Sequence, residues 1–324
     1  MTLAVLHSPA EWKARFGADS RGSAVTIGNF DGVHLGHREI LRRVVERARR
    51  DNLRATVVTF DPHPLRVLRP NEAPGLLVTL EQRMAMIEDC GVDAALLLRF
   101  DAALACLSPR EFIEQIVVGT LRTKAILVGN NFRFGHRGAG DVVLLRQFGE
   151  EFGFGVECID PVVCRGQAVS STAIRGAVSG GRLIRAGRLL GRPYSLAGEI
   201  QPGTGQGRRF VVPTLNLRTA QELLPKPGVY ATEVSVSGRK YRAATNVGVR
   251  PTFDGKALTV ESFLFDFDEQ IASGPMKVSF WARLRDEAKF SGPEALRAQI
   301  KIDAGRAKRF FRLLDRSGLK RQSA

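Results

Sequence analysis

The stretch SAVTIGNFDGVHLGHREI, residues 23–40, carries the pattern that decides the fold of the first half of the chain. It begins with a run of small and β-branched residues, which predicts a buried strand, and it ends in the first turn of a helix. A loop between them holds several glycines, an aspartate and two of the five histidines in the chain. His34 and His37 stand three positions apart, where this loop passes into the helix.

The same alternation of strand and helix continues to about residue 163. The predicted strands are 23–30, 54–60, 93–100, 124–132 and 155–163, and predicted helices follow at 38–52, 80–91, 109–121 and 141–153. Continuous runs of Val, Ile, Ala and Leu are typical of parallel strands that are covered on both faces. Right-handed crossovers between such strands give an α/β domain with a doubly wound, Rossmann-like parallel sheet.

The pattern changes in the second half of the chain. After two predicted helices at 171–181 and 182–191, short strands with turn residues follow at 194–200, 209–217, 228–238, 240–249, 258–267 and 276–285. Strands without helices between them predict a small antiparallel β-barrel, because closure of the barrel removes exposed strand edges. The segment 292–314 predicts a capping helix with a basic outer face. We therefore expect a first domain over residues 1–186 and a second over residues 187–324.

Composition narrows the class of protein further. The chain has 324 residues and a formal net charge of +15, which favours anionic partners such as nucleotides. Its four cysteines form no C-x-x-C pair, and its N-terminus lacks the pattern of a signal peptide. No apolar run reaches the ~20 residues that span a bilayer. These features predict a cytoplasmic protein without a membrane partner, and they leave homo-oligomer formation open.

The histidine pair predicts phosphate chemistry. In a doubly wound sheet, ligands bind beyond the carboxyl ends of the strands, and the loop 28–36 lies there. Its glycines allow close approach of the backbone, and the helix N-terminus offers unpaired N–H groups to a phosphate. Imidazoles placed there stabilise the charge that develops during in-line attack. The alternative is a turn histidine beside a helix cap; H-x-G-H, however, is typical of nucleotidyltransferases of the class that includes class I aminoacyl-tRNA synthetases.

An ordered set of motifs then makes the resemblance specific. TIGNFDGVHLGH, TFDPHP, VGNNFRFG and SSTAIR in the first half resemble the adenylyltransferase half of the bacterial bifunctional riboflavin kinase/FAD synthetase family. LGRPY, PTLN, LPKPGVY, NVGVRPTF, VESFLFDF and LRDEAKF continue the resemblance through the second half, in the order of the family. The resemblance covers essentially the whole chain, and it implies ATP, riboflavin, FMN and FAD as substrates and products.

For the first half, the resemblance implies that the phosphate of FMN attacks the α-phosphate of ATP and that pyrophosphate leaves. It implies His34 and His37 as contacts to the ATP phosphates, and Arg175 as a cation for the triphosphate. The further nucleotide-binding residues that it implies are Gly28, Phe30, Asp31, Asn131, Ser171 and Thr172. Ser170 fits a plain helix cap, and His63, between two prolines, fits a ligand contact and a rigid turn equally well.

For the barrel half, the resemblance implies phosphorylation of riboflavin by ATP. Gly203, Gly205 and Gly207 would let the backbone approach the phosphates. Thr214 and Asn216 alternate along a strand, so both of their oxygens can reach one Mg²⁺. Glu261 would be the general base for the attacking hydroxyl, whereas the strand pattern by itself favours an exposed carboxylate at this position.

Two departures from the family pattern keep a second hypothesis open. Val211 and Val212 replace the Gly-Phe that the family commonly has before Pro-Thr, and the segment after Glu261 also differs. The alternative is therefore an FMN adenylyltransferase whose barrel binds flavin without catalysis. A third hypothesis, an RNA-binding protein, draws on the H-x-G-H motif and the basic charge. Only 7% of the residues are aromatic, which argues against base stacking, so we expect no nucleic-acid partner.

Overall fold

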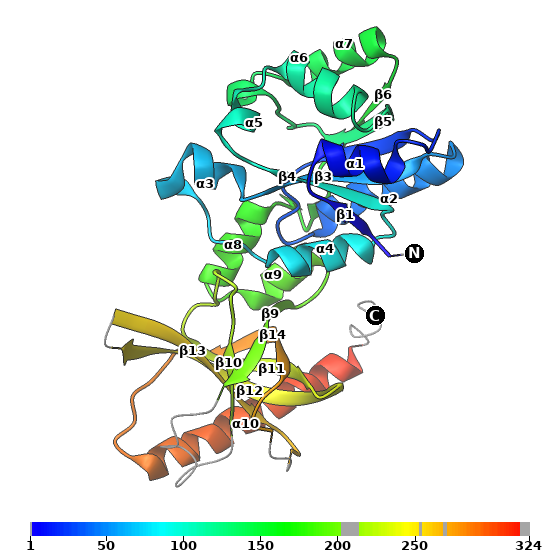
Figure 1. The fold of residues 1–324 in the computed structure, drawn as a ribbon. Helices are drawn as coiled ribbons and strands as arrows, with labels where there is room; N and C mark the ends of the chain where they lie inside the picture. The colour runs from blue at the N-terminus through cyan, green and yellow to red at the C-terminus, as the bar shows by residue number, and fades with distance from the viewer. Residues whose placement is uncertain (1, 202–213, 253–254, 268–270, 318–324) are drawn as a thin grey trace. The chain divides into compact units, whose positions relative to one another are not determined.

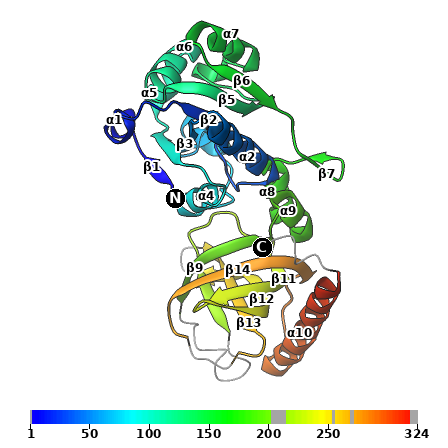
Figure 2. The same cartoon turned by 90° about the vertical axis from the view of Figure 1, so that its right-hand side faces the viewer.

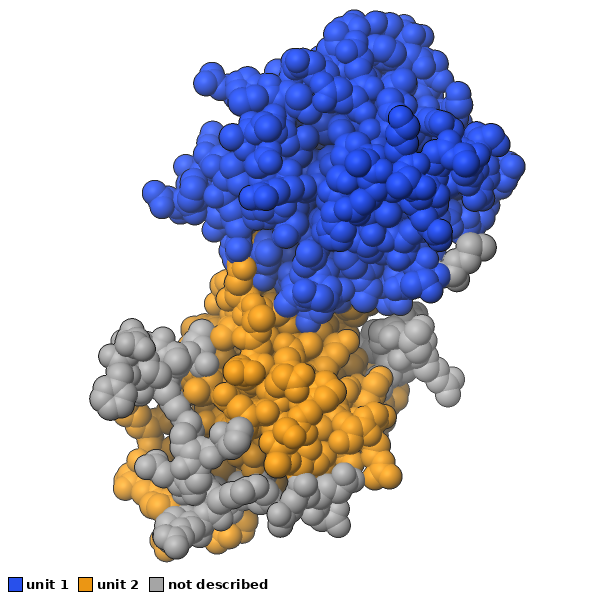
Figure 3. Space-filling view, in the orientation of Figure 1, with its two compact units in different colours: residues 1–169 blue, residues 170–324 orange. Residues whose placement is uncertain are grey.

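The computed structural model describes residues 2–201, 214–252, 255–267 and 271–317. The chain divides into two compact units, residues 1–169 and residues 170–324 (Figure 3). The helices α8 (Ser171–Ser179) and α9 (Leu183–Leu190) therefore group with the second unit. The domain boundary that the sequence predicts, between residues 186 and 187, divides the chain by function and stays a prediction.

The first unit is a six-stranded parallel sheet in the order β1-β4-β3-β2-β5-β6 (Figures 1 and 2). Its strands are β1 (Ala4–Leu6), β2 (Ser23–Ile27), β3 (Arg54–Asp61), β4 (Ala94–Arg99), β5 (Thr123–Gly129) and β6 (Gly155–Ile159). The five predicted strands and the doubly wound sheet are confirmed. The sequence analysis missed β1, because three residues are too few to reveal a strand pattern; β1 pairs in parallel with β4 at the edge of the sheet.

Helices cover both faces of this sheet. One face packs against residues of α1 (Pro9–Phe16), α6 (Pro109–Phe112), the π-helical segment η2 (Ile113–Val118) and α7 (Val142–Phe152). The other face packs against α2 (Leu35–Arg50) and α4 (Leu80–Glu88). The remaining short elements are α3 (Pro64–Leu68), η1 (Pro70–Glu72), α5 (Ala102–Cys106), η3 (His136–Gly138), β7 (Val163–Cys164) and β8 (Gln167–Ala168). Burial on both faces explains why the strands read as continuous apolar runs.

The second unit contains a closed barrel in the order β10-β13-β12-β11-β14-β9. Its strands are β9 (Tyr194–Gln201), β10 (Leu215–Arg218), β11 (Gly228–Val236), β12 (Arg239–Thr252), β13 (Gly255–Leu264) and β14 (Pro275–Arg285). The six-stranded antiparallel barrel is therefore confirmed. Ser237 and Gly238, both at positive φ, form the tight turn between β11 and β12.

The predicted capping helix is also confirmed, as α10 (Pro293–Arg316). It packs on the outer surface of the barrel, where Ala307 and Phe311 meet apolar residues of β11 and β12 such as Ala231 and Ala244 (Figure 1). Asp303, on the same buried stripe of the helix, accepts a bidentate hydrogen bond from Arg285 of β14. Apolar packing and an ion pair together fix this helix to the barrel.

Candidate functional sites

The sheet places the loop after β2 at a topological switch point. The chain runs from β2 outward to β3 and β4, whereas β5 pairs on the opposite side of β2. The connections after β2 and β5 therefore diverge to opposite faces, and in such sheets ligands bind outside the carboxyl ends of the strands at this point. The loop that holds His34 follows β2, and the turn that holds Asn131, an exposed residue, follows β5. These two predicted nucleotide contacts thus share one edge of the sheet.

His34 is the N-cap of helix α2, as well as a candidate site residue. Its backbone is extended, and its Nδ1 accepts a hydrogen bond from the backbone N–H of His37 at 3.2 Å. A neutral imidazole whose Nδ1 accepts must carry its proton on Nε2, so this contact selects a tautomer with a donor at Nε2. The side chain is 6% exposed. The helix cap thus orients the ring, which means that the structural and the chemical interpretation of His34 are compatible.

His37 stacks directly on His34. The ring centroids are 3.6 Å apart, and the planes differ by 14°. Phe30 lies beside His37, with its ring centroid 5.1 Å from that of His37. Two parallel imidazoles and a supporting aromatic ring form a preorganised group at the N-terminus of α2, where the helix dipole favours an anion.

The backbone of the same loop is strained and firmly held. Phe30 and Val33 have φ values of 49° and 36°, which are unusual for residues with a Cβ, and above all for a β-branched one. Such conformations cost about 1–3 kcal/mol each and persist only where the surroundings impose them. Both side chains are almost fully buried. Asp31, which the sequence analysis placed in the nucleotide loop, accepts the backbone N–H of Leu77 with both carboxylate oxygens, at 3.0 and 3.2 Å.

His63 lies beside this loop, and its contacts give it a structural role. It caps the short helix α3, where its Nδ1 accepts the N–H of Leu65 at 3.2 Å. Its Nε2 lies 3.2 Å from Nδ2 of Asn29. The sequence analysis did not single out Asn29, because an asparagine in a glycine-rich loop has no pattern of its own. The contact joins the loops that follow β2 and β3.

The SSTAIR motif forms the start of α8, in the second unit. Ser170 is the N-cap and accepts the N–H of Ala173 at 3.2 Å, as the sequence analysis predicted for this serine. Ser171 and Arg175 are half-buried, whereas Thr172 is exposed. Their predicted contacts to the nucleotide stay predictions.

In the barrel, three strands align polar side chains in one row. Asn216 of β10 is the register partner of Glu261 of β13, and Glu261 is in turn the partner of Asn246 of β12. Directly paired residues on neighbouring strands point to the same face of the sheet. Thr214 stands two residues before Asn216, so it lies on that face as well. The structure therefore brings together the two predicted metal ligands and the predicted base.

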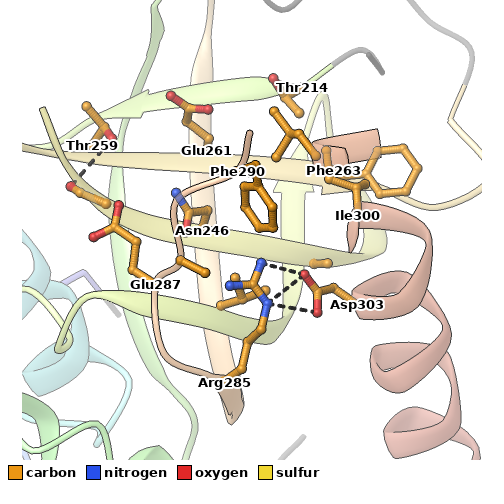
Figure 4. Close-up of a pocket in the computed structure, with 15 residues that line it drawn as sticks. Thr214, Asn246, Thr259, Glu261, Phe263, Arg285, Glu287, Phe290, Ile300 and Asp303 are labelled. Carbon is orange, nitrogen blue, oxygen red and sulfur yellow. Dashed lines mark hydrogen bonds and ion pairs between the residues drawn. The ribbon is translucent and has the colours of Figure 1, made fainter. Parts of the chain in front are cut away.

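Glu261 and Asn246 of this row line a pocket of about 260 Å³ on the outer side of the barrel (Figure 4). Thr214, Glu261 and Asn246 line it from the barrel, while Glu287 and Phe290 line it from the segment after β14. The first half of α10 supplies the remaining wall through Leu296, Ile300 and Asp303. Both sides of the pocket thus carry polar and apolar groups: Phe263 lies on the barrel side with Asn246 and Glu261, and Glu287 and Asp303 lie on the other side with Phe290 and Ile300.

Five polar residues of this pocket were not singled out from the sequence. They are Asn246, Thr259, Arg285, Glu287 and Asp303. A methyl group in place of a hydrogen on Gly248 would lie 2.8 Å from Oε1 of Glu287 and 2.9 Å from Nδ2 of Asn246, so these groups converge above this glycine. The signal was present in NVGVRPTF and LRDEAKF, but only the barrel register joins the two motifs.

Several predicted residues lie outside this geometry. Gly203, Gly205, Gly207, Val211 and Val212 fall outside the described residues, so their predicted roles remain predictions. Among the residues that are described, no three His, Cys, Asp or Glu side chains form a cluster that could hold a metal ion. No helix in the described part of the chain is long and apolar enough to cross a bilayer.

Comparisons with known proteins agree with this division. Residues 17–173 match the family model of FAD synthetase, and residues 190–311 match that of riboflavin kinase. A bifunctional riboflavin kinase/FMN adenylyltransferase from Escherichia coli K12 is 37% identical over 297 residues, which cover 91% of this chain and 95% of the relative. The relative of the same name from Pseudomonas fluorescens is 38% identical over 292 residues, covering 90% and 93%.

A solved structure supports the same arrangement of elements. The crystal structure titled "Macrolide-efflux Protein from Streptococcus pneumoniae" matches with a TM-score of 0.86 and 30% identity, and the match covers 95% of this chain and 99% of that chain. The two family models match adjoining parts of one chain, which confirms the bifunctional assignment over an adenylyltransferase with a non-catalytic barrel. The chain therefore belongs to the bifunctional riboflavin kinase/FMN adenylyltransferase family, which makes FMN from riboflavin and FAD from FMN.

Proposed function

We propose that His34 and His37 bind the phosphates of ATP during adenylyl transfer to FMN. The observation that carries this proposal is the stacked imidazole pair at the N-terminus of α2, beside a topological switch point. Because the cap orients the ring of His34 with its donor on Nε2, this Nε2–H would donate to a phosphate oxygen. Donors that are already in place stabilise developing charge more than donors that must first reorient.

In this proposal the transfer is direct. The phosphate of FMN attacks the α-phosphorus of ATP, the bond to the β-phosphate breaks, and pyrophosphate leaves with its electron pair. The residues of this chain bind and orient: Gly28, Phe30 and Asp31 shape the loop, and Asn131 contacts the nucleotide from the end of β5. Ser171, Thr172 and Arg175 of α8 bind the polyphosphate, for which the delocalised guanidinium is well suited.

For the kinase reaction, we assign Glu261 as the base that accepts the proton of the ribityl hydroxyl. Thr214 and Asn216 offer neutral oxygens to Mg²⁺, and the pairing of Asn216 with Glu261 supports this assignment because it puts the base on the same face as this ligand. Such a set fits Mg²⁺, which takes few protein ligands and shares the rest with water and phosphate. When bound, Mg²⁺ neutralises charge on the ATP phosphates. Gly203, Gly205 and Gly207 would let the backbone approach the nucleotide phosphates.

One experiment tests both assignments together. The protein is incubated with ATP, Mg²⁺ and either riboflavin or FMN, and the flavin products are separated by chromatography. We expect His34→Ala to stop FAD formation while FMN still forms from riboflavin. Glu261→Ala should stop FMN formation while FAD still forms from supplied FMN. Equal loss of both products in each variant would contradict two separate sites.

A further inference from the structure

A buried arginine connects the loop after β2 to the end of strand β3, beside the candidate adenylyl-transfer site. Arg83 lies on α4 and is only 5% exposed. Its Nη1 donates to the backbone oxygen of Asn29 at 2.9 Å, and its Nη2 donates to the backbone oxygen of Phe60 at 3.1 Å. Asn29 belongs to the loop after β2, which continues to His34, and Phe60 stands near the end of β3, three residues before His63.

Burial of a guanidinium carries a large desolvation free energy. Desolvation lowers the pKa of Arg83, and the carboxylates of Asp61 and Asp31 oppose this effect. Packing alone does not require a charge here, because an apolar side chain of similar length would fill the space without the desolvation cost. The planar fork of arginine, however, can donate to two separate carbonyls at once. The charge of Arg83 is therefore best explained by the two backbone carbonyls, of Asn29 and Phe60, to which the guanidinium donates.

Other contacts converge on the same point. The hydroxyl of Thr59 donates to the same carbonyl of Asn29 at 3.4 Å, and the side chain of Asn29 reaches Nε2 of His63. The N–H of Gly28 donates to the carbonyl of Val58 at 3.0 Å. The loop after β2 is thus joined to the carboxyl end of β3 by backbone and side-chain contacts, and Arg83 provides the charged bond between them.

We infer that Arg83 is a positioning residue for adenylyl transfer, which holds the loop of His34 against the carboxyl end of β3, where the chain continues to His63. This inference rests on the proposed role of the histidine pair. It predicts that loss of the fork displaces the loop relative to α2 without unfolding the unit. A displacement of about 1 Å at a reacting group can cost about a hundredfold in rate.

The test compares Arg83→Met and Arg83→Lys in the full-length protein. We expect Arg83→Met to lower kcat/KM for FAD formation from FMN by about ten- to a hundredfold. Arg83→Lys should recover part of this loss, because an ammonium keeps the charge and can still donate to a carbonyl. The conversion of riboflavin to FMN, measured in the same samples, should stay at the wild-type rate because the barrel is untouched.

Arg54→Met is the matched control. Arg54 is another buried arginine of the same unit, 4% exposed, which pairs with Asp19 and stacks on Phe16 at the start of β3. It should cost stability without changing the turnover of the folded enzyme. Urea unfolding of each variant gives the folded fraction, so that kcat and KM for ATP and FMN are expressed per folded molecule.

The outcomes separate this inference from the proposed function. If Arg83→Met and Arg54→Met have the same kcat and KM per folded molecule as wild type, Arg83 is only structural and the inference is wrong. If Arg83→Lys is as impaired as Arg83→Met although both are folded, the bonds to the carbonyls need the full fork, and the positioning role still holds. If His34→Ala retains FAD formation, the proposed function is wrong. If His34→Ala loses FAD formation and Arg83→Met retains it, the proposed function stands and this inference is wrong.

Discussion

The two halves of the chain assemble their candidate sites in different ways. In the sheet unit, most of the site comes from one continuous loop and helix start, residues 28–37, with local contacts such as the bond from His37 N–H to His34. In the barrel, the site comes from three strands and the segment after β14, joined only by register. A local site can be recognised from a single motif, whereas a site distributed over strands becomes visible only when the strands pair.

The largest effect should come from the base of the barrel site. We expect Glu261→Gln to lower riboflavin phosphorylation by about 10²–10⁴-fold, because the amide has the shape of the carboxylate but cannot accept the proton. The measurement is FMN formed from riboflavin, with FAD formation from supplied FMN as the internal reference. Glu199→Gln, an exposed residue of strand β9, which pairs with β10, is the matched control and should have wild-type activity. Wild-type kinase activity in Glu261→Gln would show that Glu261 is not the base of the kinase reaction.

The next effect separates the two roles of His34. Serine is a good N-cap, so His34→Ser should keep the stability of α2, whereas His34→Ala should lose about 1 kcal/mol of stability. Both variants lack the Nε2 donor, and both should lower FAD formation by about 10²–10³-fold. Thermal unfolding and FAD formation are measured in parallel. If His34→Ser retained activity, the capping bond rather than the imidazole would be the feature that matters.

A third prediction concerns the contact that closes the barrel pocket. Asp303 and Arg285 form an ion pair at 2.8 Å, with side chains only 4% and 18% exposed. Asp303→Ala should cost about 3–5 kcal/mol of barrel stability because it leaves a half-buried guanidinium without its partner. Replacing both residues, Arg285→Met with Asp303→Leu, should recover most of that loss. The readout is the urea midpoint for loss of kinase activity, and an additive loss in the double variant would show that the pair is not coupled.

The smallest effect concerns the stability of the sheet unit at low pH, to which Asp19 contributes. A hydrogen bond from Arg21 lowers the pKa of Asp19 to about 2. A carboxyl whose pKa is lower in the folded state stabilises the fold above its unfolded pKa, and this stability is lost as the pH falls toward 2. Asp19→Asn should therefore flatten the fall of the unfolding midpoint between about pH 4 and pH 2. Adenylyl transfer at neutral pH should not change; an unchanged acid limb would exclude Asp19 as its source.

Much of the fold could be predicted because the patterns are local and strong. The apolar runs of β2 to β6 reflect burial on both faces of the sheet, and the turn at Ser237 and Gly238 needs residues that tolerate positive φ. Edge strand β1 was missed because a three-residue strand has no periodicity. Asn29 and Arg83 were missed for another reason: their partners are distant in sequence. Arg83 donates to two backbone carbonyls, one of them that of Asn29, and any residue type provides a carbonyl.

The sequence by itself determined the class of fold in each half, the order of the motifs and the positions of the histidine pair, because periodicity and spacing are properties of the chain alone. Only the tertiary structure decided that Asn216, Glu261 and Asn246 form one row, and that a buried guanidinium joins the loop after β2 to the end of β3. These features depend on pairing register and on contacts between residues far apart in the chain, which no local pattern specifies.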